Sequence, residues 1–309
     1  MFLLISLNFF LPRTMPGDPI SGLLARGSVD YVSDDALRDS LADYYGLDRP
    51  LPAQYVSYLG GLVRGDLGVS IGYNVPVSRL LAERLPWTVL LISTSMTLAV
   101  GAGVLAGVHS GWRRGRAMDR GLLAFFLGVP NFPVFFVGSL ALIIFAVKLD
   151  LVPLAGAVTP FTDFGPLRRA LDIIHHLVMP ASLMALEFVS LQYLTMRAGM
   201  VSELGSDYLL LGRAKGLSER RLKYAYAARN ALLPALTVIG VQLSYAVAAA
   251  IFIERIFAYP GVGLLLFEAA GVRDYPALQG CFLVITIMVV GANFVVDTLY
   301  ARLDPRTVQ

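Results

Sequence analysis

Long runs of apolar residues, separated by shorter polar segments, dominate this chain. Five of the runs are long enough to cross a membrane as helices, because a bilayer core of about 30 Å needs about 17–25 apolar residues. We expect these spans over 86–108, 121–147, 177–196, 230–253 and 280–301. The pattern predicts an all-α membrane protein with one transmembrane domain over 1–309.

The apolar run over 1–11 is shorter than the others. At about 1.5 Å per residue it reaches only about 17 Å, and it lacks the basic start and the cleavage site of a signal peptide. We therefore expect it to be the outer part of a first span that is truncated at its N-terminus, because the chain was shortened or its start codon was assigned too late. Six spans result.

Composition agrees with a membrane protein. The chain is 56% hydrophobic and 15% charged, with a mean hydropathy of +0.67, whereas soluble domains are about 45–50% apolar and about 25% charged. This excludes an ordinary soluble enzyme and a disordered chain. Cys281 is the one cysteine, and the adjacent His175 and His176 point to different helix faces, so we expect no disulfide framework, metal or cofactor. A net charge of +3 does not indicate a nucleic-acid partner.

Charge is distributed unevenly between the two sides that six spans define. One side holds 113–120, 197–229 and 302–309. These segments carry 13 lysines and arginines against 5 acidic residues. The other side holds 12–85, 148–176 and 254–279. It carries 12 basic and 15 acidic residues in a much longer stretch of chain. Because basic loops remain in the cytoplasm, the first side and both chain ends are expected there.

The extracytoplasmic loop over 12–85 is expected to contain two amphipathic helices. Ser33 fits the N-cap of the first, which ends at Gly46, and Pro52 opens the second, which closes near Gly65. Both have apolar residues on one face. They either lie on the membrane face over the spans or form a docking surface for a protein that delivers a substrate.

The cytoplasmic loop over 197–229 has a different character. Its sequence from Tyr208 predicts a helix, a break at Gly216, and a second helix capped by Ser218. An exposed helix–turn–helix is expected to dock a partner. The alternative is a basic interfacial loop that only sets the orientation of the chain.

Polar residues inside the spans are candidate sites, because an ionisable residue in a bilayer is functional by default. The residues that we expect to line a pathway are Glu187, Gln192, Tyr193 and Gln242. For Glu187, pairing with a polar group from another span or subunit is the alternative. For the other three, it is hydrogen bonding between helices. Asp297 lies near the end of the last span, where we expect it to be structural.

Small residues and prolines predict how two of the spans are built. Gly101, Gly103 and Gly107 form a pattern that favours close helix packing. Pro130 and Pro133 are expected to kink the span over 121–147, with the freed carbonyls satisfied by neighbouring helices.

The chain has no nucleotide-binding loop. The pattern G-x-x-x-x-G-K-[ST] is absent, and of the three lysines only Lys215 neighbours a glycine, on the wrong side. Nor is there a nucleophile with a base partner for an intramembrane enzyme. We therefore expect no enzyme activity, and any ATP hydrolysis must belong to separate subunits.

Several different short motifs are distributed along almost the whole chain. They are Pro16-Gly17-Asp18-Pro19, Tyr45–Pro52, Gln54-Tyr55, Arg64–Gly68, Arg84–Pro86, Arg213–Arg221, Arg229–Pro234, Tyr259–Gly263, Arg273–Pro276, Gln279-Gly280 and Asp304–Arg306. Each is weak alone, but their order and spacing are specific. Together they resemble the inner-membrane permease subunits of ABC importers of the oligopeptide and dipeptide type. The resemblance implies the six-helix permease fold of the type I importers.

The resemblance also implies that the loop over 197–229 is the family's EAA loop, whose short coupling helix sits on the ATPase subunit. Carried over, the coupling residues are Asp207, Leu209, Leu210, Leu211, Gly212, Arg213, Ala214, Lys215, Gly216 and Leu217. Leu209 to Leu211 would make apolar contacts with the ATPase. Gly212 departs from the family's usual alanine, and Tyr226 stands where a histidine is usual.

Further partners follow from the resemblance. They are a second homologous permease, two ATP-binding subunits or domains, an extracytoplasmic substrate-binding protein and the lipid of a prokaryotic inner membrane. Peptides are the first expectation for the substrate, and oligosaccharides, nickel chelates and haem remain open. The competing class is a standalone secondary transporter, which needs coupling-ion sites and usually an internal repeat or paired broken helices. No such repeat is evident.

Overall fold

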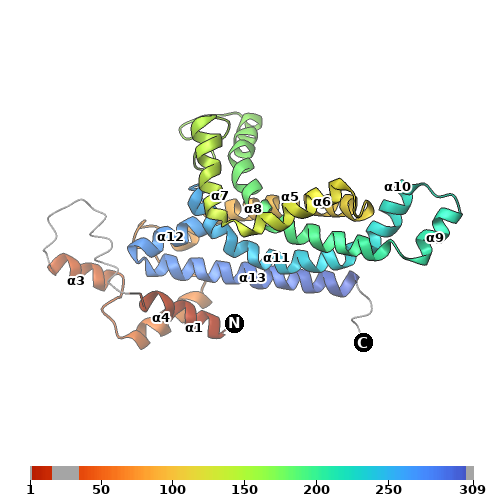
Figure 1. The fold of residues 1–309 in the computed structure, drawn as a ribbon. Coiled ribbons are helices and arrows are strands. Elements are labelled where there is room, and N and C mark those ends of the chain that lie inside the picture. Colours follow the sequence, from red (N-terminus) through yellow and green to blue (C-terminus); the bar gives the residue numbers. More distant parts are fainter. Residues whose placement is uncertain (1, 16–34, 304–309) are drawn as a thin grey trace. The chain divides into compact units, whose positions relative to one another are not determined.

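The computed structural model describes residues 2–15 and 35–303, which fold into helices joined by loops (Figure 1). Among these residues the one β-type pairing is an isolated bridge between Val69 and Pro76. The chain divides into two compact units, Met1–Thr88 with Pro260–Met288 and Val89–Tyr259 with Val289–Gln309. The expected all-α class is confirmed. The N-cap expected at Ser33 lies outside the described residues.

The first unit contains α1 (Phe2–Arg13), α3 (Asp35–Tyr44), α4 (Leu51–Val63), the start of α5 (Val77–Trp112), α12 (Val262–Val272) and the first part of α13 (Tyr275–Leu303), up to Met288. The two helices predicted in the outer loop are therefore present as α3 and α4. The helix α5 begins at Val77, so the last residues of the predicted loop are helical. The predicted loop over 254–279 contains α12 and the first turn of α13.

The core of the first unit joins segments far apart in the sequence. Its buried members are Val77, Leu80, Leu81, Val262, Leu265 and Cys281. Beside it, the buried carboxylate of Asp274 accepts hydrogen bonds from the Ser70 hydroxyl at 2.5 Å and the Gly72 N–H at 2.9 Å. It also accepts one from the Ala277 N–H at 3.1 Å, which caps the start of α13. Asp274 therefore ties the turn over 70–72 to this helix.

The second unit contains the rest of α5, α6 (Ala117–Gly128), η1 (Val129–Asn131), α7 (Val134–Ala141), η2 (Leu142–Lys148), α8 (Pro166–Glu203), α9 (Asp207–Ala214), α10 (Glu219–Arg221), η3 (Leu222–Ala227), α11 (Ala228–Ile256) and the end of α13. Its central contact is between α8 and α11. Figure 1 shows α8 changing direction along its length. Pro180 lies inside that helix and removes a backbone donor there, a common cause of a bend.

Glycines let α5 approach α8 closely. A Cβ placed on Gly103 would lie 2.8 Å from the Gln192 Cβ, and one on Gly107 would lie 2.7 Å from the Met196 Cβ. One turn further, a Cβ on Gly111 would lie 2.5 Å from the Met200 Cβ. The close helix packing that the glycines predicted is present. Gly101 is not part of it, because a Cβ placed there would have no neighbour within 4 Å.

The predicted spans and the observed helices differ in length and number. Among the described residues, four helices are long and apolar enough to cross a membrane: Val77–Trp112, Pro166–Glu203, Glu219–Ile256 and Tyr275–Val295. A fifth is possible only if Ala117–Asn131 and Val134–Lys148 form one span. α1 has 12 residues and falls below that length. The predicted number of six is not reached by length and composition alone.

The third predicted span is broken. Its two halves meet at an angle of 100°, a much larger change of direction than the predicted kink. Pro130 lies in η1 and Pro133 precedes the first residue of α7. Proline lacks the N–H for a helical hydrogen bond and restricts the preceding residue to extended conformations, which explains why two prolines three residues apart end one helix and start another.

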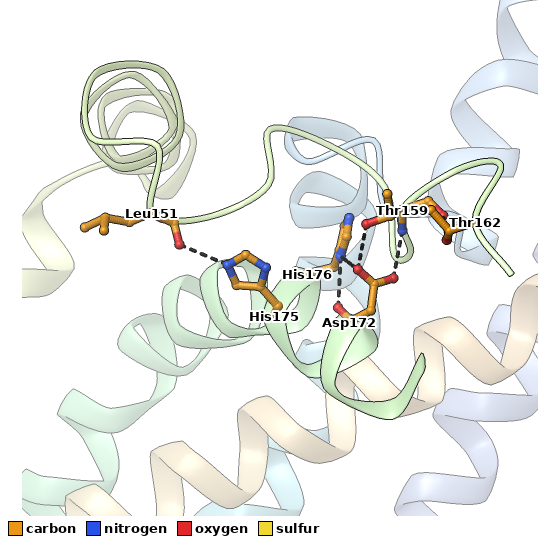
Figure 2. Close-up of polar contacts among 6 residues, drawn as sticks. All are labelled: Leu151, Thr159, Thr162, Asp172, His175 and His176. Carbon is orange, nitrogen blue, oxygen red and sulfur yellow. Dashed lines mark hydrogen bonds and ion pairs between the residues drawn. The ribbon is translucent and has the colours of Figure 1, made fainter. Parts of the chain in front are cut away.

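Polar contacts attach the segment after η2 to the start of α8 (Figure 2). The Asp172 carboxylate accepts hydrogen bonds from the Thr159 N–H at 2.8 Å and the Thr159 hydroxyl at 2.6 Å. A ring nitrogen of His175 contacts the Leu151 carbonyl at 3.0 Å, whereas His176 faces Asp172. Figure 2 shows the two imidazoles directed to different partners: His175 contacts the segment at Leu151, whereas His176 contacts Asp172 within its own helix.

Candidate functional site

The candidate site is the loop between α8 and α11, which Figure 1 shows at one end of this helix pair. α9 begins at Asp207, directly after Ser206, and ends at Ala214. The predicted coupling residues therefore form this helix and the turn that follows it. Ser218 comes next and caps α10, with its hydroxyl accepting from the Arg221 N–H at 3.4 Å. The predicted helix–turn–helix is present.

The turn at Gly216 ends α9 in a specific geometry. Gly216 has a φ of +74°, in the left-handed region that glycine adopts without strain. The Leu217 N–H donates to the Gly212 carbonyl at 3.0 Å, and the Gly216 N–H donates to the Arg213 carbonyl at 2.9 Å. This pair of bonds is the Schellman arrangement, which satisfies carbonyls that a helix end leaves free. The turn direction thus depends on the backbone of one residue.

Two faces of α9 have opposite environments. Leu209 is fully buried, and it packs with Leu222 and Met200 in the core beneath the loop. Leu210 and Leu211 are 67% and 54% exposed. The outer face of α9 therefore carries two adjacent leucines that this chain leaves uncovered, whereas Leu209 cannot make the apolar partner contact expected of it.

Gly212 belongs to the inner face. A Cβ at this position would lie 2.5 Å from the Leu222 Cδ2 and 3.5 Å from the Leu217 Cδ1. The glycine that departs from the family's alanine therefore lets α9 lie against Leu222. Its low helix propensity, about 1 kcal/mol below alanine, is offset by this close packing.

Charged side chains surround the exposed leucines. Asp207, Arg213 and Lys215 are exposed on the helix and its end. The Arg213 Nε lies 3.3 Å from the Glu219 Oε1, across the turn, and its guanidinium carbon lies 5.9 Å from the centre of the Trp112 ring. Both contacts are partly exposed and each is worth at most about 1 kcal/mol, so Arg213 is free to exchange them for contacts with a partner.

The start of α9 is held by a second set of contacts. The Tyr208 hydroxyl donates to the Glu203 carboxylate, and the Ser206 hydroxyl donates to the Glu203 carbonyl. Burial raises the pKa of Tyr208, and the bond to Glu203 raises it further, so the phenol stays a neutral donor. Both ends of the helix are therefore fixed before any partner binds.

An ion pair that the sequence did not indicate lies behind the loop. The Arg197 Nε and Nη2 donate to the two Asp119 carboxylate oxygens at 2.6 and 2.9 Å. The Asp119 carboxylate also accepts hydrogen bonds from the Ser110 hydroxyl at 2.5 Å and from the Gly115 N–H at 2.8 Å. The Asp119 side chain is 2% exposed. The pair joins α6 to α8 and the end of α5. The one sequence signal was an acid in the first turn of a helix.

The predicted pathway residues separate into two groups. Gln192, Tyr193 and Gln242 are buried within the unit. The Gln192 Nε2 donates to the Ala235 carbonyl at 3.3 Å, and the Gln242 Nε2 to the Phe188 carbonyl at 2.7 Å. The Tyr193 hydroxyl lies 2.6 Å from that of Ser110. These three make the interhelical contacts that were the alternative, and in this conformation they face no open space.

Glu187 differs from the other three. It is exposed on this chain and lines a hollow of about 330 Å³ at the break in the third predicted span, together with Pro130, Phe132 and Pro133. Among the described residues, the other three candidates are buried, whereas Glu187 is exposed and lines this hollow. Asp297 lies within α13, and its side chain is outside the described set.

Long apolar helices connected by a structured polar loop define a multi-pass membrane protein. Residues 99–309 match the family described as binding-protein-dependent transport system inner membrane components, and the chain belongs to this family. The resemblance drawn from the motifs is thereby confirmed.

Relatives of known name cover nearly the whole chain. A protein of Brucella suis biovar 1, named as a peptide permease, is 38% identical over 301 residues, which are 97% of this chain and 92% of the relative. The di/tripeptide transport system permease protein DppB of Pseudomonas aeruginosa is 34% identical, with 97% and 92% covered. The oligopeptide transport system permease protein AppB of Bacillus subtilis is also 34% identical with the same coverage.

Proposed function

We propose that this chain is the permease subunit of an ATP-driven importer of peptides. With a second homologous permease it forms the translocation pathway, and two separate ATP-binding subunits or domains drive it. The observation that carries the proposal is the loop over 206–221, which presents Leu210 and Leu211 on a helix fixed at both ends. An uncovered pair of leucines between charged side chains is typical of a surface that a protein partner covers.

The peptide substrate rests on the relatives, whose names specify peptides, di- and tripeptides and oligopeptides. Oligosaccharides, nickel chelates and haem remain alternative substrates of the same machinery. An extracytoplasmic binding protein delivers the substrate. ATP hydrolysis is assigned to the separate subunits, because the sequence of this chain has no nucleotide-binding loop.

The proposed orientation places the loop over 197–229 and both chain ends in the cytoplasm. The excess of basic residues on this side supports it. The proposal has six crossings, with α1 assigned to the first and the broken pair of α6 and α7 to the third. Glu187 is the proposed pathway residue, because it is exposed and lines a hollow at the break in the third predicted span.

The contact surface on the ATPase side consists of Asp207, Leu210, Leu211, Arg213, Ala214 and Lys215. Gly216 and Leu217 set the turn behind it. Leu209 and Gly212 lie on the inner face of α9. Their packing against Leu222 holds the helix against the core.

The test is reconstitution of this chain with its second permease, ATPases and binding protein in proteoliposomes. We expect uptake of a radiolabelled tripeptide that requires ATP, and we expect Leu211→Arg to reduce it at least about tenfold, because a charge replaces an apolar contact at the interface core. The control is Leu154→Arg, another exposed leucine, outside this loop. ATP-independent uptake by the chain alone would instead identify a secondary transporter.

A further inference from the structure

A hollow of about 310 Å³ opens on the first unit. Its walls come from the end of α1, the loop after α3, one face of α4, the segment over 66–68 and the first turn of α13. Several of the motifs singled out in the sequence meet here, including Tyr45–Pro52, Gln54-Tyr55 and Gln279-Gly280. The coupling loop does not explain why these segments come together.

The guanidinium of Arg13 is held in place at the wall of this hollow. Its Nη1 donates to the Phe9 carbonyl at 2.8 Å and its Nη2 to the Gln54 Oε1 at 2.9 Å. Gln54 is itself fixed, because its Nε2 donates to the Leu47 and Arg49 carbonyls at 3.2 and 2.8 Å. The guanidinium carbon lies 3.6 Å from the centre of the Phe9 ring. A guanidinium has five N–H donors, so the contacts to Phe9 and Gln54 fix its direction and leave other donors without a partner among the described residues.

Arg13 has no carboxylate partner within ion-pair distance in the part of the chain that the structure describes. A half-buried arginine is expected to have one, because desolvation of an unpaired charge is unfavourable. Among the described residues, the site is therefore built around a cation without an anionic partner.

Two more unused donors line the same hollow. The Tyr58 hydroxyl and the Gln279 Nε2 are buried, and neither has a hydrogen-bond partner among the described residues. Gln279 is only 8% exposed. Buried polar groups in native proteins are normally paired, so each unpaired donor requires an explanation. Together with Arg13 they provide three donors from α1, α4 and α13 around one space.

We propose that this hollow binds a short peptide, with its terminal carboxylate accepting from Arg13, Tyr58 and Gln279. The exposed carboxylates of Asp43 and Asp66 also line the hollow and provide acceptors for the ammonium end of the same ligand. The hollow thus offers both charges that a zwitterion needs. This inference rests on the proposed function, because it assigns to a peptide importer a peptide site of its own, separate from that of the binding protein.

The size of the hollow favours a small ligand over a protein surface. Sites for small molecules are concave and occupy about 300–1,000 Å³, whereas protein partners cover flatter areas of about 800 Å² a side. Planar guanidinium groups bind carboxylates through paired hydrogen bonds. A peptide carboxylate therefore fits these donors better than a neutral ligand such as a sugar.

The test measures binding directly, on this chain assembled with its second permease and ATPases in lipid nanodiscs, without the binding protein. Saturation-transfer NMR compares trialanine with trialanine amide, which lacks the carboxylate. We expect trialanine to bind at least about tenfold more tightly, because charge-assisted hydrogen bonds are about twice as strong as neutral ones. Arg13→Gln is expected to remove this difference.

Tyr58→Phe provides a variant that keeps the fold, because the hydroxyl it removes has no partner in the described chain. We expect it to weaken trialanine binding about threefold to tenfold. The matched controls are Arg64→Gln and Tyr245→Phe, which lie outside the hollow and should leave binding unchanged. Equal binding of acid and amide, or equal binding by wild type, Arg13→Gln and Tyr58→Phe, would overturn the inference.

Two further outcomes separate this inference from the proposed function. ATP-driven import of trialanine by a complex that shows no saturation transfer would refute the hollow as a peptide site and leave the function intact. If instead the empty binding protein loses affinity for the Arg13→Gln complex while trialanine binding does not change, the hollow receives a carboxylate of that protein, and the peptide assignment is wrong. Absence of ATP-driven import contradicts the function, whatever the NMR result.

Discussion

Replacement of Gly216 by valine tests whether transport depends on the geometry of the loop that we propose contacts the ATPase. Gly216 has a φ of +74°, and a Cβ placed on it would have no neighbour within 4 Å among the described residues, so a new side chain begins in open space. The whole effect must therefore come from the backbone. A left-handed conformation costs an L-residue about 1–2 kcal/mol, with valine, which is β-branched, at the upper end.

The loop can respond in two ways. It can keep the strained conformation, or it can rotate Gly216 and lose the hydrogen bonds to Gly212 and Arg213, each worth about 0.5–1.5 kcal/mol. Rotation would also move Leu217 out of the core beneath α9. The strain of about 1–2 kcal/mol therefore shifts the equilibrium between the docking-competent loop and the rotated loop by about five- to thirty-fold toward the rotated one.

The assay is ATP-driven peptide uptake by the reconstituted importer, normalised to the amount of chain in the membrane. We expect Gly216→Val to transport about five- to thirty-fold more slowly than wild type, and Gly216→Asn to remain close to it, because asparagine tolerates the left-handed region. Gly205→Val is the matched control: Gly205 lies in the same loop with open space but has no positive φ. Wild-type uptake by Gly216→Val, or an equal loss in Gly205→Val, would refute the reasoning.

Two further predictions concern the second unit. Gly107→Leu should lower the free energy of unfolding by about 1–3 kcal/mol, because the new Cβ would lie 2.7 Å from the Met196 Cβ. Thermal unfolding in detergent measures this loss. Gly101→Leu is the control and should unfold like wild type, because a Cβ there has no neighbour within 4 Å. Asp119→Asn should lower stability by about 2–3 kcal/mol, below the range for a fully buried pair because Arg197 is 21% exposed. Adding Arg197→Gln should recover part of that loss, and strictly additive losses would show that the two side chains are not coupled.

Local patterns in the sequence were sufficient for the features that depend on neighbouring residues. Runs of apolar residues identified the long helices, because burial or lipid contact of every face needs no information from elsewhere in the chain. Gly216 and Ser218 located the end of α9 and the start of α10, because both caps are formed by residues within a few positions. The order of short motifs was enough to identify the family.

The two prolines correctly located the interruption of the third predicted span, but the change of helix direction there is larger than the predicted kink. Pro130 and Pro133 indicated an interruption in the third predicted span, and the helices there do change. Whether two prolines bend a helix slightly or turn it by 100° depends on what packs against each half. Here the neighbours are α8 and α11, which contact α7.

Other features were decided only by the tertiary structure. Asp119 and Arg197 are 78 positions apart, and no pattern in the sequence links them. The glycines in contact with α8 are Gly103, Gly107 and Gly111, although Gly101 fitted the small-residue pattern equally well. The sequence by itself determined an all-helical membrane protein of this family, with the ends of α9, the helix that we propose contacts the ATPase. Which side of α9 a partner can reach was decided by long-range packing, because Leu222 and Met200 cover Leu209 and leave Leu210 and Leu211 exposed.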